Sequence, residues 1–164
     1  MSKITEIRIA ELFAGNDDNV IITNGVGSCV VIILYDRLMR VGGMAHAILP
    51  RAKEFSKSEP YRDRDTEGRL FVKYADSAVD MLIAEVQSLG GVKEHLVAKI
   101  VGGAHMFSLL EGDQYGIGWE NTNAARERLL SNMVTIETEV IGGTVGRNVR
   151  FDCATGIAEI VTKV

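Results

Sequence analysis

Residues 23–50 read TNGVGSCVVIILYDRLMRVGGMAHAILP: a glycine-rich loop, then two apolar runs on either side of a short polar turn. Valine, isoleucine and tyrosine favour strands, so the two runs predict the arms of a β-hairpin. If Tyr35 and Arg40 close a four-residue loop, antiparallel pairing places Cys29 directly opposite His46. Opposed side chains share one face of the sheet, with Cβ atoms about 4.5–5.5 Å apart. The hairpin thus predicts a thiol–imidazole pair, which a one-residue slip in register would separate.

The remaining sequence predicts further strands and two helices. Helical periodicity covers residues 71–89 and stops at Gly90-Gly91, and a second helix is expected over 123–133 with Asn121 or Thr122 as its N-cap. Besides the hairpin arms, strands are expected at 4–10, 20–23, 96–101, 134–140, 149–153 and 157–163, with loop at 112–118. Residues 30–34 are apolar on both faces and should be buried on both sides.

These elements predict an α+β fold in which two mixed or antiparallel β-sheets pack as a sandwich with the two main helices outside. A chain of 164 residues is most simply one domain, spanning 1–164, and can bury a real core. The charged residues 51–69 are expected to form a long loop. Such a loop is either a lid or binding segment beside the histidine strand or a solvated insertion.

Composition excludes several classes of function. The net charge of −4 and the absence of a basic stripe give no electrostatic reason to expect nucleic acid or an anionic membrane. The longest apolar run, residues 30–35, is far shorter than the roughly 20 residues that span a bilayer. The N-terminus has no signal-peptide h-region, and two cysteines fit a reducing compartment. A cytoplasmic protein without membrane insertion is therefore expected.

Cys29 and His46 are the candidate catalytic residues. A strand cysteine is usually a small buried hydrophobe, and a lone histidine is usually a core residue bonded to a carbonyl. Here Cys29 follows a glycine-rich loop, and a neighbouring imidazole can generate a thiolate or act as general base and acid. Backbone N–H groups near Gly25 and Gly27 can turn towards an oxyanion.

The other motifs and candidate residues give weaker indications of function. Residues 25–30 lack the last glycine of a dinucleotide-binding fingerprint and precede a strand, so nucleotide binding is not expected. A zinc site would need Cys29, His46 and two more ligands, and no Cys-x-x-Cys or His-x-x-His spacing supplies them, so no metal is expected. Cys153 is assigned to packing and His95 to the surface, whereas His105, beside a Gly-Gly turn, stays open.

The order of several motifs resembles the CheD family, the chemoreceptor glutamine deamidases of bacterial chemotaxis. The motifs are Thr23-x-Gly-x-Gly-Ser-Cys-Val, then Val41-Gly-Gly-Met-Ala-His-x-x-Leu-Pro, Lys73-Tyr-Ala-Asp, Ala98-Lys-Ile-x-Gly-Gly-Ala-x-Met-Phe, Ile117-Gly-x-x-Asn and Gly142-Gly-x-x-Gly-Arg. They cover nearly the whole chain. Asn24 and His105 depart from the family pattern, and the 51–69 loop is longer than usual, which bears on substrate choice and partner binding.

The resemblance implies a fold similar to the deamidase domain of cytotoxic necrotizing factors and a cysteine hydrolase without a cofactor. It assigns Cys29 as nucleophile, His46 as base and Thr23 as the third active-site residue. The expected reaction converts glutamine side chains of methyl-accepting chemoreceptors to glutamate through a Cys29 thioester, with glutamate methylesterase activity on the side. The oxyanion would be held by N–H groups near Gly27 and Ser28.

Two other functions remain as hypotheses. The chain could be a non-catalytic binding module that docks to a CheC-type phosphatase and stimulates it, as the resemblance allows. It could also be a redox-sensing thiol, although the sequence places no resolving cysteine near Cys29.

Overall fold

The computed structural model describes residues 2–52, 64–106 and 116–163, which form two β-sheets and two α-helices. The strands are β1 (Lys3–Glu6), β2 (Glu11–Gly15), β3 (Asn19–Val26), β4 (Val30–Asp36), β5 (Val41–Ala47), β6 (Leu70–Phe71), β7 (Val97–Gly102), β8 (Thr135–Ile141), β9 (Arg147–Asp152) and β10 (Ile157–Thr162). The helices are α1 (Ala75–Ser88) and α2 (Ile117–Ser131), with a short 3₁₀ turn, η2 (Lys93–His95).

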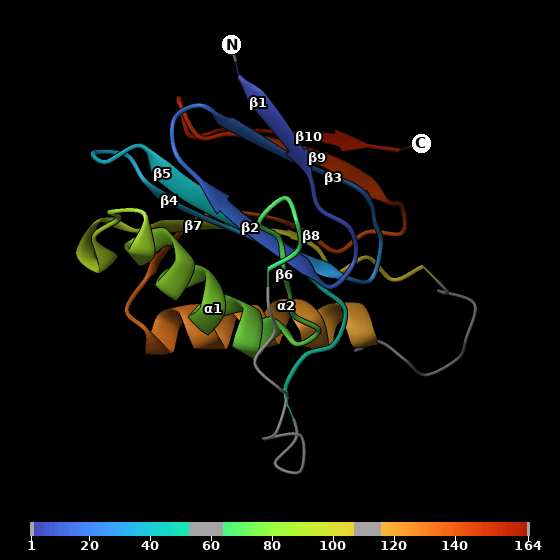
Figure 1. Cartoon of the computed structure of the whole chain (residues 1–164). Coiled ribbons are helices and arrows are strands. Elements are labelled where there is room, and N and C mark those ends of the chain that lie inside the picture. Colours follow the sequence, from blue (N-terminus) through green and yellow to red (C-terminus); the bar gives the residue numbers. More distant parts are fainter. Residues whose placement is uncertain (1, 53–63, 107–115, 164) are drawn as a thin grey trace.

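The elements form three layers (Figure 1). A four-stranded sheet, in the order β1-β3-β9-β10, packs on a six-stranded sheet, in the order β6-β2-β5-β4-β7-β8. Both helices cover the other face of the six-stranded sheet. The β1–β3 and β7–β8 pairs are parallel and the others are antiparallel. The expected sandwich with helices outside is therefore confirmed.

Strand β4 lies at the centre and is buried on both sides, as its continuous apolar sequence predicts. Val30, Ile32 and Leu34 face the helices, where they pack with α1 and α2. Val31 and Ile33 face the four-stranded sheet and join the core between the two sheets. The two apolar faces of one strand thus hold the three layers together.

The two helices differ from the sequence prediction in their first turns. α1 begins at Ala75, because residues 70–71 pair with β2 as strand β6. It ends at Ser88, two residues before Gly90, whose left-handed backbone (φ 102°) provides the expected stop. α2 begins at Ile117 with Gly116 as its N-cap, six residues earlier than expected. Asn121 is therefore inside the helix, which is a correction to its predicted N-cap role, and Gly118 is helical rather than loop.

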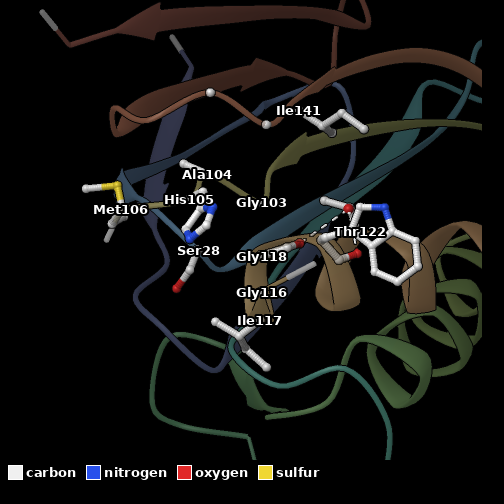
Figure 2. A pocket seen from close by; sticks show the side chains of 13 residues that line it. Ser28, Gly103, Ala104, His105, Met106, Gly116, Ile117, Gly118, Thr122 and Ile141 are labelled. Carbon is white, nitrogen blue, oxygen red and sulfur yellow. Dashed lines mark hydrogen bonds between the residues drawn. The ribbon is translucent and has the colours of Figure 1, made fainter. Parts of the chain in front are cut away.

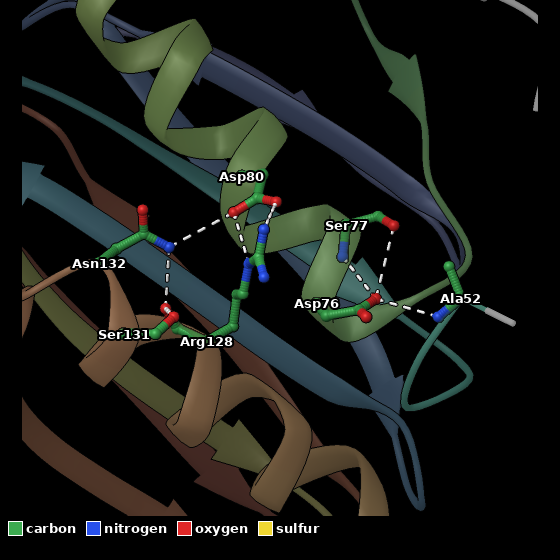
Figure 3. A network of polar contacts seen from close by, with 7 residues as sticks. All are labelled: Ala52, Asp76, Ser77, Asp80, Arg128, Ser131 and Asn132. Carbon is green, nitrogen blue, oxygen red and sulfur yellow. Dashed lines mark hydrogen bonds and ion pairs between the residues drawn. The ribbon is translucent and has the colours of Figure 1, made fainter. Parts of the chain in front are cut away.

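Polar contacts tie α1 to α2 on the surface (Figure 3). The Arg128 guanidinium on α2 forms a forked ion pair with the Asp80 carboxylate on α1, with Nε at 2.8 Å from Oδ1. Asn132 also donates to Asp80, at 3.4 Å. Because both partners of the ion pair are nearly half exposed, the contact orients the helices more than it stabilises the fold.

The hairpin forms, but its register differs from the prediction. Asp36 pairs with Val41, so the loop is Arg37 to Arg40 and His46 lies opposite Val31 rather than Cys29. The Asp36 carboxylate accepts hydrogen bonds from the N–H groups of Leu38 and Met39, and this turn chemistry moves the closing pair one residue further along. Cys29 precedes β4 and is diagonal to His46 instead of directly opposite it.

Several strand boundaries differ from the sequence prediction. β2 (Glu11–Gly15) was not expected, and the predicted 4–10 strand is confined to Lys3–Glu6. β3 extends through Gly25 and Val26 with an irregular register against β9 after Thr23. Most of the predicted 51–69 loop, and residues 112–115 of the predicted 112–118 loop, lie outside the described residues.

Candidate functional site

A hydrogen bond between the two sheets joins two of the predicted site residues. Thr23 lies on β3 of the four-stranded sheet, and His46 lies near the end of β5 of the six-stranded sheet. The Thr23 hydroxyl is 2.7 Å from His46 Nδ1 and 2.8 Å from the carbonyl oxygen of Ile7. Both side chains are fully buried. The structure thus brings Thr23 and His46 together from segments that are distant in sequence.

The two contacts of Thr23 define the state of the imidazole. A carbonyl oxygen can only accept, so the single hydroxyl proton of Thr23 goes to Ile7. The hydroxyl oxygen must then accept from the Nδ1–H of His46. In the neutral ring Nε2 therefore carries the lone pair, which is the form that a general base requires.

The environment keeps His46 neutral. Burial lowers the pKa of His46 from its ordinary value of 6.5 to about 4, because a buried imidazolium would lose its hydration. The Nε2 atom is buried and has no hydrogen-bond partner in the described part of the chain. A buried acceptor without a partner is uncommon, and at a candidate site it marks a place where a proton can be received.

Cys29 lies just before β4 and is 6% exposed. Its carbonyl oxygen accepts from Gly103 N–H at 2.8 Å, which continues the β4–β7 ladder back to Cys29. By strand alternation Cys29 shares the face of Val31, whose partner across the hairpin is His46. No hydrogen bond joins the thiol to Nε2 within the described residues, so the pair is close in topology but not bonded.

Burial also acts on the thiol. Loss of hydration raises the pKa of Cys29, and the N–H group of Cys29 itself works in the opposite direction by facing the sulfur. No backbone acceptor in the described residues takes the N–H of Ser28 or Cys29. The N–H of Gly25, by contrast, is bonded to the Asn148 side chain at 3.1 Å. The N–H groups of Ser28 and Cys29, beside the sulfur, are therefore candidate donors to an oxyanion.

One polar residue contacts both the Cys29 segment and the His46 segment, and sequence reasoning missed this role. Asn121 on α2 is fully buried, and its Nδ2 donates to the carbonyl oxygens of Ser28 at 2.9 Å and Ile48 at 3.0 Å. Sequence reasoning placed Asn121 at a helix N-cap, where asparagine is favoured. Its signal was the Ile117-Gly-x-x-Asn motif, whose role is only visible once α2 is seen to start at Ile117.

A pocket of about 280 Å³ lies beside Ser28 (Figure 2). Ser28, His105 and Met106 line one side, and Ile117 and Thr122 of α2 line the other, with glycines of three loops between them. Gly27 also approaches this side, since a Cβ built there would meet the Met106 side chain at 3.3 Å. Neither Cys29 nor His46 lines the pocket.

The other titratable candidates lie apart from this centre. Cys153 is fully buried between the sheets, and burial raises its pKa to about 12, in agreement with a packing role. His95 is exposed, as expected, and bonds to the buried Asp36 carboxylate at 3.1 Å. Across residues 2–52, 64–106 and 116–163, no three His, Cys, Asp or Glu side chains gather in a metal-binding arrangement.

In the same ranges, no helix combines the length and the apolar character that a membrane span requires.

Comparison with known proteins gives a consistent result. A family model described as CheD chemotactic sensory transduction matches residues 56–162. The chain is 40% identical over 158 residues to a probable chemoreceptor glutamine deamidase CheD 2 of Geobacter metallireducens, which covers 96% of this chain and 92% of the relative. It is 37% identical over 162 residues to the Clostridium botulinum protein named probable chemoreceptor glutamine deamidase CheD (98% and 93%). The Pyrococcus abyssi protein of that name is 35% identical over 157 residues (95% and 90%).

Proposed function

The chain belongs to the CheD family, and from this premise we propose that it is a protein-glutamine glutaminase that deamidates methyl-accepting chemoreceptors. The relatives that this chain matches over nearly their full lengths carry the name probable chemoreceptor glutamine deamidase. The observation that carries the proposal is the Thr23–His46 hydrogen bond, which leaves Nε2 of a neutral imidazole as an unpaired acceptor near the strand of Cys29. Thr23 is the positioning residue in this scheme.

The proposed first half-reaction forms a thioester. Cys29 Sγ attacks the side-chain amide carbon of glutamine while its proton moves to His46 Nε2. The oxygen of the tetrahedral intermediate accepts hydrogen bonds from the N–H groups of Ser28 and Cys29, which no backbone acceptor takes within the described residues. The resulting imidazolium returns its proton to the leaving nitrogen, the C–N bond breaks, and ammonia departs.

The second half-reaction releases glutamate. His46 Nε2 takes a proton from water, the hydroxide equivalent attacks the thioester carbon, and the sulfur leaves and recovers the proton from His46. The net reaction is glutamine plus water to glutamate plus ammonia, and no cofactor takes part. A glutamate methyl ester would follow the same path with methanol in place of ammonia, so methylesterase activity is part of the proposal.

Ammonia release from a purified cytoplasmic receptor fragment tests the proposal, with mass spectrometry locating the glutamine that gains about 1 Da. Cys29→Ala and His46→Ala should abolish turnover. Cys153→Ala removes the other cysteine, which is buried in the inter-sheet core, and should retain it. Normal turnover by Cys29→Ala would refute the proposed chemistry.

A partner role is a second candidate. Exposed apolar side chains flank the site: Ile48 and Leu49 after β5, and Ile117 and Trp119 at the start of α2, are 37–47% exposed. Exposed apolar surface favours a protein partner, here either the receptor helix or a CheC-type phosphatase. Cys29→Ala should leave binding and stimulation of such a phosphatase intact, whereas Trp119→Ala should weaken it. Equal phosphatase activity with and without the wild-type protein would remove this role.

A further inference from the structure

Asn121 connects the two segments that carry the proposed nucleophile and base. Its single amide nitrogen donates one hydrogen bond to the Ser28 carbonyl, one residue before Cys29, and one to the Ile48 carbonyl, two residues after His46. The three segments are far apart in the sequence, separated by 93 and 73 residues from Asn121. Both N–H bonds of the amide are therefore used to hold two backbone positions at a fixed separation.

The bond to Ser28 also orients the peptide group that precedes the sulfur. The described chain contains no cis peptide bonds, so the C=O and N–H of the Ser28–Cys29 peptide point in opposite directions. Because Asn121 fixes the carbonyl on the α2 side, the Cys29 N–H is directed away from α2 and towards the thiol, where it opposes the rise in the Cys29 pKa that burial causes. An oxyanion donor in a defined direction is thus a consequence of the Asn121 contact.

The helix that carries Asn121 is itself tightly seated. A Cβ added to Gly118 would lie 2.6 Å from the Ala104 carbonyl oxygen and 2.7 Å from that of Gly103, so the first turn of α2 touches the backbone after β7. The Cys29 carbonyl bonds to Gly103 N–H in the same region. Asn121 therefore projects from a rigid element, which suits a residue that sets distances between other groups.

We infer that Asn121 is a positioning residue of the active site, which holds the Cys29 loop and the end of the His46 strand in the relative geometry that proton transfer needs. This inference rests on the proposed deamidase function. It assigns to Asn121 no contact with substrate. The competing interpretation is that Asn121 merely satisfies two buried carbonyl groups, and it predicts a loss of stability alone.

Two variants and one matched control separate these interpretations. Asn121→Leu keeps the branched shape and the number of heavy atoms and removes both donors. Asn121→Ala leaves room for water to bridge the carbonyls if the leucine variant does not fold. Asn132→Ala is the control, because Asn132 lies at the other end of α2 and its amide also makes two hydrogen bonds, to Asp80 and to the Arg128 carbonyl. All are compared well below their unfolding temperatures.

The expected result is a fall in kcat of about tenfold to a hundredfold in the Asn121 variants, with KM within about twofold of the wild type, since misplacement by about 1 Å can cost a hundredfold. Asn132→Ala should lose stability and keep its kcat. Alkylation of Cys29 by iodoacetamide, followed by mass spectrometry of the labelled peptide, should become at least about threefold faster, because the released loop uncovers a residue that is now only 6% exposed.

The inference would be overturned if folded Asn121 variants kept kcat within about twofold of the wild type, or if only KM rose. Failure of the deamidase function itself gives a different pattern, in which the wild-type protein releases no ammonia. In that case the iodoacetamide rate still tests the contact, and equal rates for wild type and both Asn121 variants would overturn it.

Discussion

Replacing Thr23 with valine tests the hydrogen bond that defines the His46 tautomer. Valine has nearly the shape of threonine, so Thr23→Val removes the hydroxyl and little else. The Ile7 carbonyl then loses the partner that now lies at 2.8 Å, and His46 Nδ1 loses the one at 2.7 Å. Thr23→Ser, which keeps the hydroxyl, is the matched control.

The structure sets the size of both effects. One buried polar group left without a partner costs about 1–3 kcal/mol, so two such groups predict a loss of about 2–6 kcal/mol in the free energy of unfolding. In Thr23→Val the Nδ1–H of His46 has no acceptor to hold it in place. The ring can then adopt the tautomer with its proton on Nε2, and Nε2 can no longer act as the base. In a serine protease triad the wrong tautomer costs about 10⁴ in kcat, and because a neutral hydroxyl orients less strongly than a carboxylate, we expect about 10²–10³ here. That corresponds to about 3–4 kcal/mol of transition-state stabilisation.

Two measurements check this prediction. Steady-state ammonia release gives kcat, and ¹⁵N NMR of histidine-labelled protein reports which ring nitrogen carries the proton; the chain has three histidines, and His46→Ala assigns the signal. The wild type and Thr23→Ser should have a protonated Nδ1. If Thr23→Val turned over at a rate within about threefold of the wild type, or if the wild-type ring carried its proton on Nε2, the reasoning from the Thr23 contacts would be wrong.

Three further predictions use other parts of the molecule. With the pKa of His46 at about 4, the acid limb of kcat/KM should lie below pH 6.5, because the base is lost only when the pH falls through the lowered pKa; a pH–rate profile with a limb at 6.5 or above would contradict this. Gly102→Ala should lower stability by about 1–3 kcal/mol and slow turnover, since φ is +118° and the new Cβ would lie 2.4 Å from the Cys29 carbonyl oxygen. Gly25 also has a positive φ but has open space around it, so Gly25→Ala should lower the free energy of unfolding in urea by less. Asp36→Ala should destabilise the fold by about 2–4 kcal/mol above pH 5. Burial raises the pKa of the Asp36 carboxyl, but hydrogen bonds, led by that from Val92 N–H, lower it by more, so the stability that Asp36 contributes is present above its unfolded pKa and is lost as the pH falls through its folded pKa. Equal denaturation midpoints of the variant and the wild type at pH 7 would refute this prediction.

The hairpin is the part of the fold that local sequence predicts best, but local sequence does not predict its exact register. Strand propensity and the polar turn predict two paired strands and a four-residue loop, which the structure has. The Asp36 side chain accepts hydrogen bonds from the loop, so Asp36 is the last paired residue of β4 and not the first residue of the loop. The error is two residues along one strand relative to the other. Since side-chain direction has a period of two, Cys29 and His46 are still expected on the same face.

Contacts between layers are the part that local sequence does not contain. The Thr23–His46 hydrogen bond joins two sheets, and Thr23 enters the prediction only through the family resemblance. Propensity assigns the N-cap to Asn121 or Thr122, but the helix begins earlier, after Gly116, and the Asn121 side chain is buried inside the fold. Periodicity and propensity describe each element separately, whereas these two residues act where elements meet.

The two pKa shifts together define the resting state of the proposed active site. Burial lowers the pKa of His46 to about 4 and raises that of Cys29, so at neutral pH the thiol keeps its proton and the imidazole stays uncharged. An ion pair formed in advance would have to overcome both shifts without hydration. Under the proposed mechanism, proton transfer from Cys29 to Nε2 therefore accompanies attack on the amide, when the developing oxyanion is already held by the N–H groups beside the sulfur. Such a thiol should react slowly with small alkylating agents in the free protein and fast only with a bound glutamine side chain.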